Sequence, residues 1–142
     1  MRKTILVLIF LMFAASHQCA HAATRGSLRI YYYNWDAFPN ARITADSIRE
    51  NADAKISSAS SAYITEFSEW IGKFRMSRCD GVKAADPPSL HLLIELERNG
   101  KLQIWVSDKT RLYSSDYREC AEIGDEFRDK FRWLDPWYAK VP

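Results

Sequence analysis

Few residues in this 142-residue chain could act in catalysis, and His91 is the first candidate. A histidine beside a serine can act as general base for a nucleophile, provided that a carboxylate orients the imidazole ring. The pattern of the chain places Ser107 opposite His91 across a predicted β-hairpin, with Asp108 or Glu95 as the nearest acids in sequence. Neither acid is positioned by this pattern to orient the ring. We therefore expect His91 to be a structural residue of a sheet and assign it no catalytic role.

Glu95 and Glu97 form a second candidate pair, because alternate residues of a strand lie on the same face. Two carboxylates can perform the acid and base steps of glycosidic hydrolysis, but the acid must be removed from water. Here the expected neighbours are polar, and Lys101 is expected opposite Glu97. The pattern favours a solvated pair of carboxylates with a cross-strand ion pair.

Other known site motifs are missing from the sequence. It contains no HExxH, no GxSxG, no P-loop and no glycine-rich dinucleotide turn. It also lacks a closely spaced set of cysteines, histidines and acids of the kind that binds metal ions. We predict no catalytic residue, no bound cofactor and no metal site.

Residues 1–22 have the pattern of a secretory signal peptide. Arg2 and Lys3 precede an apolar run at 5–15, which is too short to span a bilayer. Residues 20–22 read Ala-His-Ala, a small-x-small cleavage site. We therefore predict a protein that is exported to the periplasm or secreted.

Cleavage after residue 22 would leave residues 23–142 as a single α+β domain without a stable membrane anchor. An uncleaved anchor and a lipoprotein acylated at Cys19 are the alternatives. Removing the two basic residues of the signal from a total of 20 leaves 18, which equals the number of acidic residues. A neutral domain has no electrostatic preference for nucleic acid, so we predict no nucleic-acid partner.

Cys79 and Cys120 are the two cysteines that remain after cleavage. In an exported protein they are expected to form one disulfide, and with only two cysteines the pairing is fixed. Such a bond would stabilise the fold by about 2–4 kcal/mol. A metal or redox pair is the weaker alternative, since there is no CxxC spacing.

A β-hairpin between residues 89 and 107 is the clearest structural pattern in the chain. Apolar residues alternate with other residues on both sides of Asn99-Gly100. A two-residue type I′ turn would pair Leu96 with Gln103, so an apolar row would meet a polar row. We predict a three-residue loop at 98–100 instead, which places Leu96 opposite Leu102 and Leu93 opposite Trp105.

The remaining elements are expected to complete a small α+β domain. The hydrophobic spacing predicts strands at 28–33 and 117–123, with 54–57 and 110–113 as further strand candidates, and helices at 44–52, 60–76 and 125–134. The predicted fold is an antiparallel sheet of four or five strands with two or three helices packed on one face. Trp35 and Phe38 are expected to fold back from the loop at 34–42 over the core.

Aromatic residues are abundant, with five Trp and seven Tyr, all outside the predicted signal peptide. Exposed Trp and Tyr beside charged residues are typical of recognition surfaces. We predict that one sheet face forms such a surface, although the C-terminal tail or the loop at 34–42 could cover it instead. The predicted binding residues are Tyr31, Tyr33, Trp35, Leu93 and Trp105.

The function predicted from these features is that of an exported, non-enzymatic binding protein with a protein partner. It would belong to the inhibitor, immunity or chaperone-like proteins of the cell envelope. One alternative is a small exported hydrolase that acts on an envelope polymer, using His91 or the pair of Glu95 and Glu97. The other is a small-ligand binder with an aromatic pocket.

Overall fold

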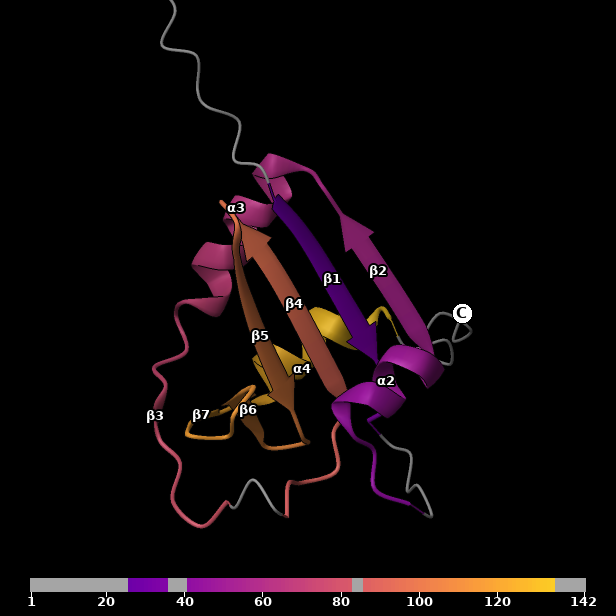
Figure 1. Cartoon of the computed structure of the whole chain (residues 1–142), viewed down its shortest axis with the longest axis vertical. Coiled ribbons are helices and arrows are strands. Elements are labelled where there is room, and N and C mark those ends of the chain that lie inside the picture. Colours follow the sequence, from indigo (N-terminus) through magenta and orange to yellow (C-terminus); the bar gives the residue numbers. More distant parts are fainter. Residues whose placement is uncertain (1–25, 36–40, 83–85, 135–142) are drawn as a thin grey trace, which may run out of the picture.

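One open antiparallel sheet organises the chain in the computed structural model, which describes residues 26–35, 41–82 and 86–134 (Figure 1). The described residues contain seven strands, where four or five were predicted, together with three helices, and the predicted α+β class is confirmed. The strands are β1 (Gly26–Tyr32), β2 (Ala54–Ser58), β3 (Ser77–Arg78), β4 (Leu92–Arg98), β5 (Lys101–Ser107), β6 (Arg111–Ser114) and β7 (Glu119–Glu122). The helices are α2 (Ala45–Asn51), α3 (Ser61–Ile71) and α4 (Asp125–Arg132).

The strands follow the order β2-β1-β4-β5-β6-β7-β3 across the sheet. Strands β4 to β7 form a meander of neighbours in sequence. In contrast, β1 is inserted between β2 and β4, and the contacting residues Arg29 and Glu95 of β1 and β4 are 66 positions apart. Strand β4 therefore lies inside the sheet, with long-range pairing on one side and a hairpin on the other.

Different helices cover the two faces of the sheet (Figure 1). Helices α3 and α4 pack on one face, here called the helix face, where β1 and β4 contribute alternate apolar residues such as Ile30 and Ile94. Helix α2 packs on the opposite face, here called the α2 face, where Ile48 joins Leu93 and Val106. The prediction of two or three helices on one face is confirmed for α3 and α4, whereas α2 covers the second face, which has an apolar row of its own.

Helix α3 is shorter than the predicted helix at 60–76 and ends at Ile71. Its buried residues Ile64, Phe67 and Ile71 follow helical spacing, as predicted for a stripe that faces the core. Gly72 forms the C-cap and donates its backbone N–H to the carbonyl of Ser68 at 3.1 Å. The low helix propensity of glycine explains why the helix ends there although apolar residues continue beyond it.

The register of the β4–β5 hairpin corrects the predicted one. Leu96 pairs with Gln103, and Arg98 pairs with Lys101, so the loop contains only Asn99 and Gly100. Both loop residues have positive φ angles, 53° and 74°, as a type I′ turn requires. The predicted loop at 98–100 assumed that only one face of the hairpin is buried. Because both faces are buried around β4, the apolar residues of β5 do not have to face those of β4.

The loop after β1 folds back over the core, as predicted for Trp35. This side chain is 9% exposed, belongs to the core of the helix face and lies edge-on to Tyr32, with ring centroids 6.1 Å apart. Phe38 and the C-terminal tail lie outside the described residues, as do the predicted signal peptide and its cleavage site. Export and cleavage therefore remain predictions.

Cys79 and Cys120 lie at disulfide distance, with their Cα atoms 5.2 Å apart, in agreement with the predicted pairing. Strand β3 directly precedes Cys79 and pairs with β7 at only two positions. It forms the outer edge of the sheet beyond β7. The disulfide thus reinforces the attachment of a two-residue strand that has little pairing of its own.

Candidate functional site

The sequence predicted one binding surface from Tyr31, Tyr33, Trp35, Leu93 and Trp105, and the structure divides this set. Tyr31, Tyr33 and Leu93 belong to the cluster on the α2 face, and Leu93 is fully buried there. Trp105 pairs with Ile94 and packs with the helix-face core, where Trp35 also lies. The corrected register therefore removes Trp105 from the α2 face and places Leu102 and Ile104 there.

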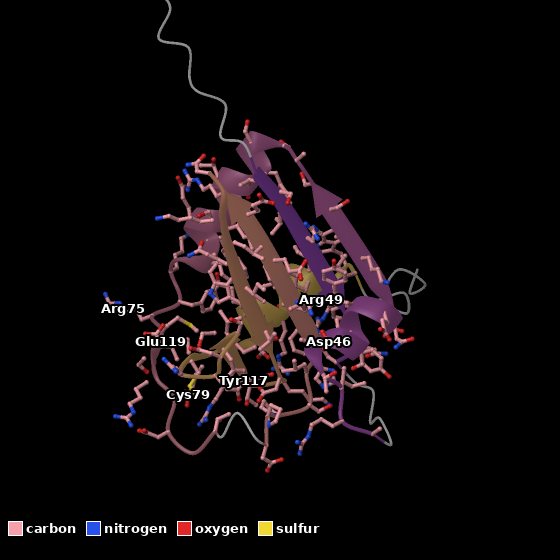
Figure 2. The ribbon with its side chains drawn as sticks, in the orientation of Figure 1. Asp46, Arg49, Arg75, Cys79, Tyr117 and Glu119 are labelled. Atoms are coloured by element: carbon pink, nitrogen blue, oxygen red, sulfur yellow. A yellow bond between two sulfur atoms is a disulfide. The ribbon has the colours of Figure 1, made fainter. Side chains whose placement is uncertain are left out.

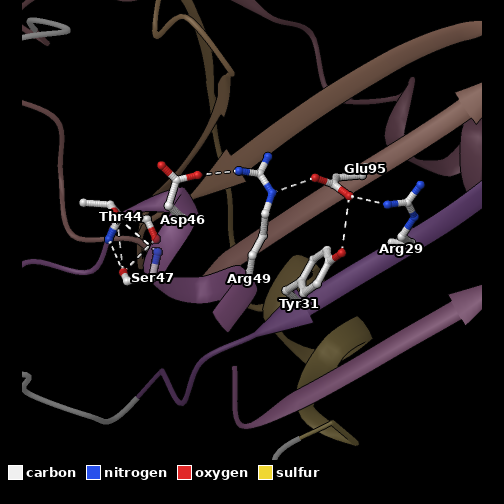
Figure 3. Close-up of polar contacts among 7 residues, drawn as sticks. All are labelled: Arg29, Tyr31, Thr44, Asp46, Ser47, Arg49 and Glu95. Atoms are coloured by element: carbon white, nitrogen blue, oxygen red, sulfur yellow. Dashed lines mark hydrogen bonds and ion pairs between the residues drawn. The ribbon is translucent and has the colours of Figure 1, made fainter. Parts of the chain in front are cut away.

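A carboxylate network lies at the centre of the α2 face (Figure 3). Glu95, whose side chain is 9% exposed, accepts a hydrogen bond from Arg49 Nε at 2.9 Å on Oε1. Its Oε2 accepts from Arg29 and from the Tyr31 hydroxyl, each at 3.4 Å. A buried carboxylate must be compensated by opposite charge and hydrogen bonds, and Glu95 has both. The prediction that Glu95 and Glu97 are both solvated carboxylates is therefore wrong for Glu95.

Helix α2 positions Arg49 over this carboxylate. Thr44 and Ser47 form a reciprocal capping box that fixes the start of the helix. One turn later, Arg49 donates to Asp46 Oδ1 at 2.7 Å as well as to Glu95 (Figure 3). The hydrogen bond to Glu95 is the main reason that the pKa of Arg49 is raised above its ordinary value. The network therefore holds α2 to the sheet through charge as well as through the buried Ile48.

Beyond α2 the same face is open to solvent. Leu102 is 57% exposed, and Glu97, its partner on β4, is also exposed. Ile104 pairs with Glu95 and is partly buried, so it connects the exposed leucine to the carboxylate network. We call this area the recognition surface, formed by Arg29, Tyr31, Glu95, Leu102 and Ile104.

His91 is a structural residue in the fold. Its side chain is almost fully buried, its Nδ1 lies 2.8 Å from the carbonyl oxygen of Asn34, and its ring stacks on Trp35 with centroids 5.7 Å apart. Burial lowers the pKa of His91 below its ordinary value. The predicted opposition of His91 and Ser107 is wrong, because Ser107 pairs with Leu92 and is fully buried. The histidine instead fastens the loop after β1 to the start of β4.

A pocket beside the disulfide is the feature that the sequence analysis missed. It has a volume of about 610 Å³, within the range of small-molecule sites. One wall is the segment around β3 and the other is the turn between β6 and β7; the lining residues are Arg78, Cys79, Val82, Asp116, Tyr117, Arg118 and Glu119. Figure 2 shows Cys79, Tyr117 and Glu119 well away from Asp46 and Arg49. This disulfide pocket is therefore separate from the carboxylate network.

The turn between β6 and β7 gives Tyr117 an unusual backbone. Its φ angle is 58°, in the left-handed region that is costly for a bulky residue. The turn is held by side-chain hydrogen bonds, including Ser114 Oγ to Asp116 Oδ1 at 2.7 Å and the backbone N–H of Glu119 to Ser114 Oγ at 3.0 Å. The Tyr117 ring lies beside the Tyr113 ring, with centroids 5.6 Å apart. Partial burial raises the pKa of Tyr117. No sequence pattern indicates this conformation.

The described residues contain no group of three or more histidines, cysteines and acids that could hold a metal ion. None of the helices formed by these residues is long and apolar enough to cross a membrane. Compared with known proteins, the chain matches no protein-family model, no curated protein and no solved structure.

Proposed function

We propose that this chain is an exported, non-enzymatic binding protein that recognises another protein through its recognition surface. It would act as an inhibitor, an immunity protein or a chaperone-like protein of the cell envelope. The single observation that carries this proposal is Leu102, a large apolar side chain that is 57% exposed beside an ordered network of charged groups. The pairing of Cys79 and Cys120 supports the export part, because disulfides persist in oxidising compartments.

The recognition surface has the composition of a protein-binding patch. Energetically important residues of such patches are enriched in Trp, Tyr and Arg and are surrounded by groups that exclude water. Leu102 and Ile104 supply the apolar part, and Arg29 supplies a guanidinium that is 48% exposed. The sheet fixes the backbone of these residues, and Glu95 orients the Arg29 side chain, which reduces the entropy lost on binding.

The chemistry of the partner can be inferred from the donors that remain. Arg29 contacts Glu95 through one nitrogen at 3.4 Å, while Arg49 makes the shorter contact at 2.9 Å. Guanidinium groups carry five N–H donors, so Arg29 retains donors that point to solvent. We infer a partner that presents a carboxylate or backbone carbonyls to Arg29 and an apolar depression to Leu102.

Affinity capture from an envelope extract tests the proposal, using three forms of the protein. The wild type should retain one partner in stoichiometric amount. Leu102→Glu should lose this partner, since it places a charge where an apolar contact is needed. Trp133→Ala is the matched control, because Trp133 is equally exposed but lies at the end of α4. Circular dichroism should show that both variants are folded.

The outcomes separate the proposal from its alternatives. Equal capture by wild type and Leu102→Glu would contradict the recognition surface. Turnover of an envelope polymer without a stoichiometric partner would instead support the hydrolase hypothesis based on His91 or on Glu95 and Glu97.

A further inference from the structure

The disulfide pocket combines two segments that are far apart in sequence. Arg78, Cys79 and Val82 form one wall, and residues 116–119 form the other. The walls are joined by the disulfide between positions 79 and 120 and by the two residue pairs of β3 and β7. The backbone N–H of Cys79 also donates to the carbonyl of Arg118 at 2.9 Å. The two walls of the pocket are thus linked covalently as well as by backbone hydrogen bonds.

The ionised groups of the pocket differ in whether they are already paired. Arg118 Nε lies 3.3 Å from Asp116 Oδ2, and Asp116 also accepts from Ser114 and from the Arg118 backbone. These hydrogen bonds, first of all that from Ser114, lower the pKa of Asp116. In the described part of the chain, the side chains of Arg78 and Glu119 make no hydrogen bond and no ion pair. The pocket therefore offers one guanidinium and one carboxylate to a ligand.

The rest of the lining is apolar. The lining residues without charge are Cys79, Val82 and Tyr117, while the charged Arg78 and Glu119 lie opposite each other across the β3–β7 pair. Tyr117 is held in its left-handed conformation by the hydrogen bonds of the turn. Strained residues of this kind are often found at ligand sites, where the surrounding structure maintains them. A flat or branched apolar group can lie against the ring and the valine.

We propose that the disulfide pocket binds a small zwitterion, namely a free amino acid with an apolar side chain. The ligand's carboxylate pairs with Arg78, its ammonium group pairs with Glu119, and its side chain packs on Tyr117 and Val82. A simple anion would be repelled by Glu119, and a simple cation would be repelled by Arg78. This site goes beyond the proposed function, since it lies on different residues from the recognition surface.

Titration of the isotope-labelled full chain with phenylalanine, followed by two-dimensional amide NMR, tests the proposal. Chemical-shift changes should cluster at residues 78–82 and 116–119. N-acetyl-phenylalanine lacks the ammonium charge and phenylalanine amide lacks the carboxylate, so each should bind about tenfold more weakly than the free amino acid.

Variants of the two charged residues assign the contacts. Arg78→Gln should weaken binding of the free amino acid but strengthen binding of the amide, a cation that Arg78 repels. Glu119→Gln should weaken binding of the free amino acid but strengthen binding of the N-acetyl form, an anion that Glu119 repels. Arg75→Gln and Glu122→Gln are matched controls, because both residues are exposed and neither lines the pocket. These controls should bind like the wild type.

Three results would overturn the proposal. These are the absence of shift changes at the pocket, equal affinity for the amino acid and its two blocked forms, and equal losses in the charged-residue variants and their controls. Each can occur while capture of a protein partner by the recognition surface succeeds. Failure of this inference is therefore distinct from failure of the proposed function.

Discussion

Trp105 lies directly opposite Ile94 across the β4–β5 pair, on the face that α3 and α4 cover. Leu93, one position before Ile94, consequently lies on the other side of the sheet from Trp105. The hairpin therefore contributes apolar side chains to two cores instead of one. This gives Trp105 a structural role, so the partner binding proposed above rests on other residues, such as Leu102.

Trp105→Ala should destabilise the protein by about 2–3 kcal/mol, somewhat less than a fully buried tryptophan, because the indole packs on the core but remains partly accessible. Leu102→Ala is the control on the same strand and should change the free energy of unfolding by less than about 0.5 kcal/mol. Urea denaturation of both variants measures the difference. Loss of partner binding by Trp105→Ala with unchanged stability would restore the surface predicted from the sequence.

Glu95→Gln should lower the free energy of unfolding by about 1–3 kcal/mol. The amide keeps one accepting oxygen but carries no charge, so it cannot form the ion pairs with Arg49 and Arg29, although water can partly solvate both guanidinium groups. The exposed Glu97→Gln should have almost no effect. Thermal or urea unfolding compares the two. Equal effects would show that the network around Glu95 does not stabilise the attachment of α2.

His91 should make stability depend on pH. Burial lowers its pKa in the folded state, so the unfolded chain binds a proton more readily than the folded chain. The free energy of unfolding should then fall as pH decreases below the ordinary histidine value of 6.5, and it should be restored as pH rises again. Urea denaturation between pH 7 and about 5.5 measures this pH dependence of the free energy of unfolding. Most carboxylates titrate below this pH range.

His91→Gln is the matching variant, because glutamine can still donate to the carbonyl of Asn34 but does not titrate. It should remove the slope in this pH range and leave partner capture at pH 7 unchanged. If the free energy of unfolding of the variant still depends on pH in this range, the titrating group is not His91. Loss of function at unchanged stability would favour the hydrolase hypothesis.

Breaking the pairing of Cys79 and Cys120 should lower the free energy of unfolding by about 2–4 kcal/mol, since the bond closes a loop over a sequence separation of 41. Replacing both cysteines by alanine and measuring urea denaturation tests this. Partner capture by the recognition surface should continue in the folded variant, whereas phenylalanine binding should be lost. Unchanged phenylalanine binding would mean that the walls of the pocket are held by other contacts.

Mass spectrometry of the exported protein tests the predicted signal peptide. Protein expressed with its full sequence and collected after export should begin at Ala23. Its intact mass should rise by two hydrogens upon reduction, which shows one disulfide. A lipidated start at Cys19 or a retained leader would contradict the prediction.

Much of the fold follows from local patterns in the sequence. Leu28, Ile30 and Tyr32 alternate with polar or less buried residues and form the buried side of β1. Thr44 and Ser60 are N-cap residues of α2 and α3, as their hydroxyl side chains indicate. These features depend on residues within a few positions of one another, which is why periodicity and capping rules recover them.

The remaining features depend on contacts that are distant in sequence. The register of the β4–β5 hairpin was predicted on the assumption that one face of the hairpin is buried. In the structure, Ile48 of α2 helps to bury the second face. Strand β3 has only the exposed residues Ser77 and Arg78, so it carries no hydrophobic pattern. The disulfide pocket depends on the left-handed backbone of Tyr117, which its residue type does not favour.

The bond between Cys79 and Cys120 also has a consequence for the order of folding. The covalent ring encloses β4, β5 and β6, which are neighbours in both sequence and space. Strand β1 lies outside the ring and must find β4 across the long separation between Arg29 and Glu95. Non-local pairing of this kind is slow because the intervening chain loses entropy before contacts form. In the oxidised chain, the meander is therefore confined before folding starts, and the arrival of β1 with β2 is expected to complete the sheet and bury its central strand.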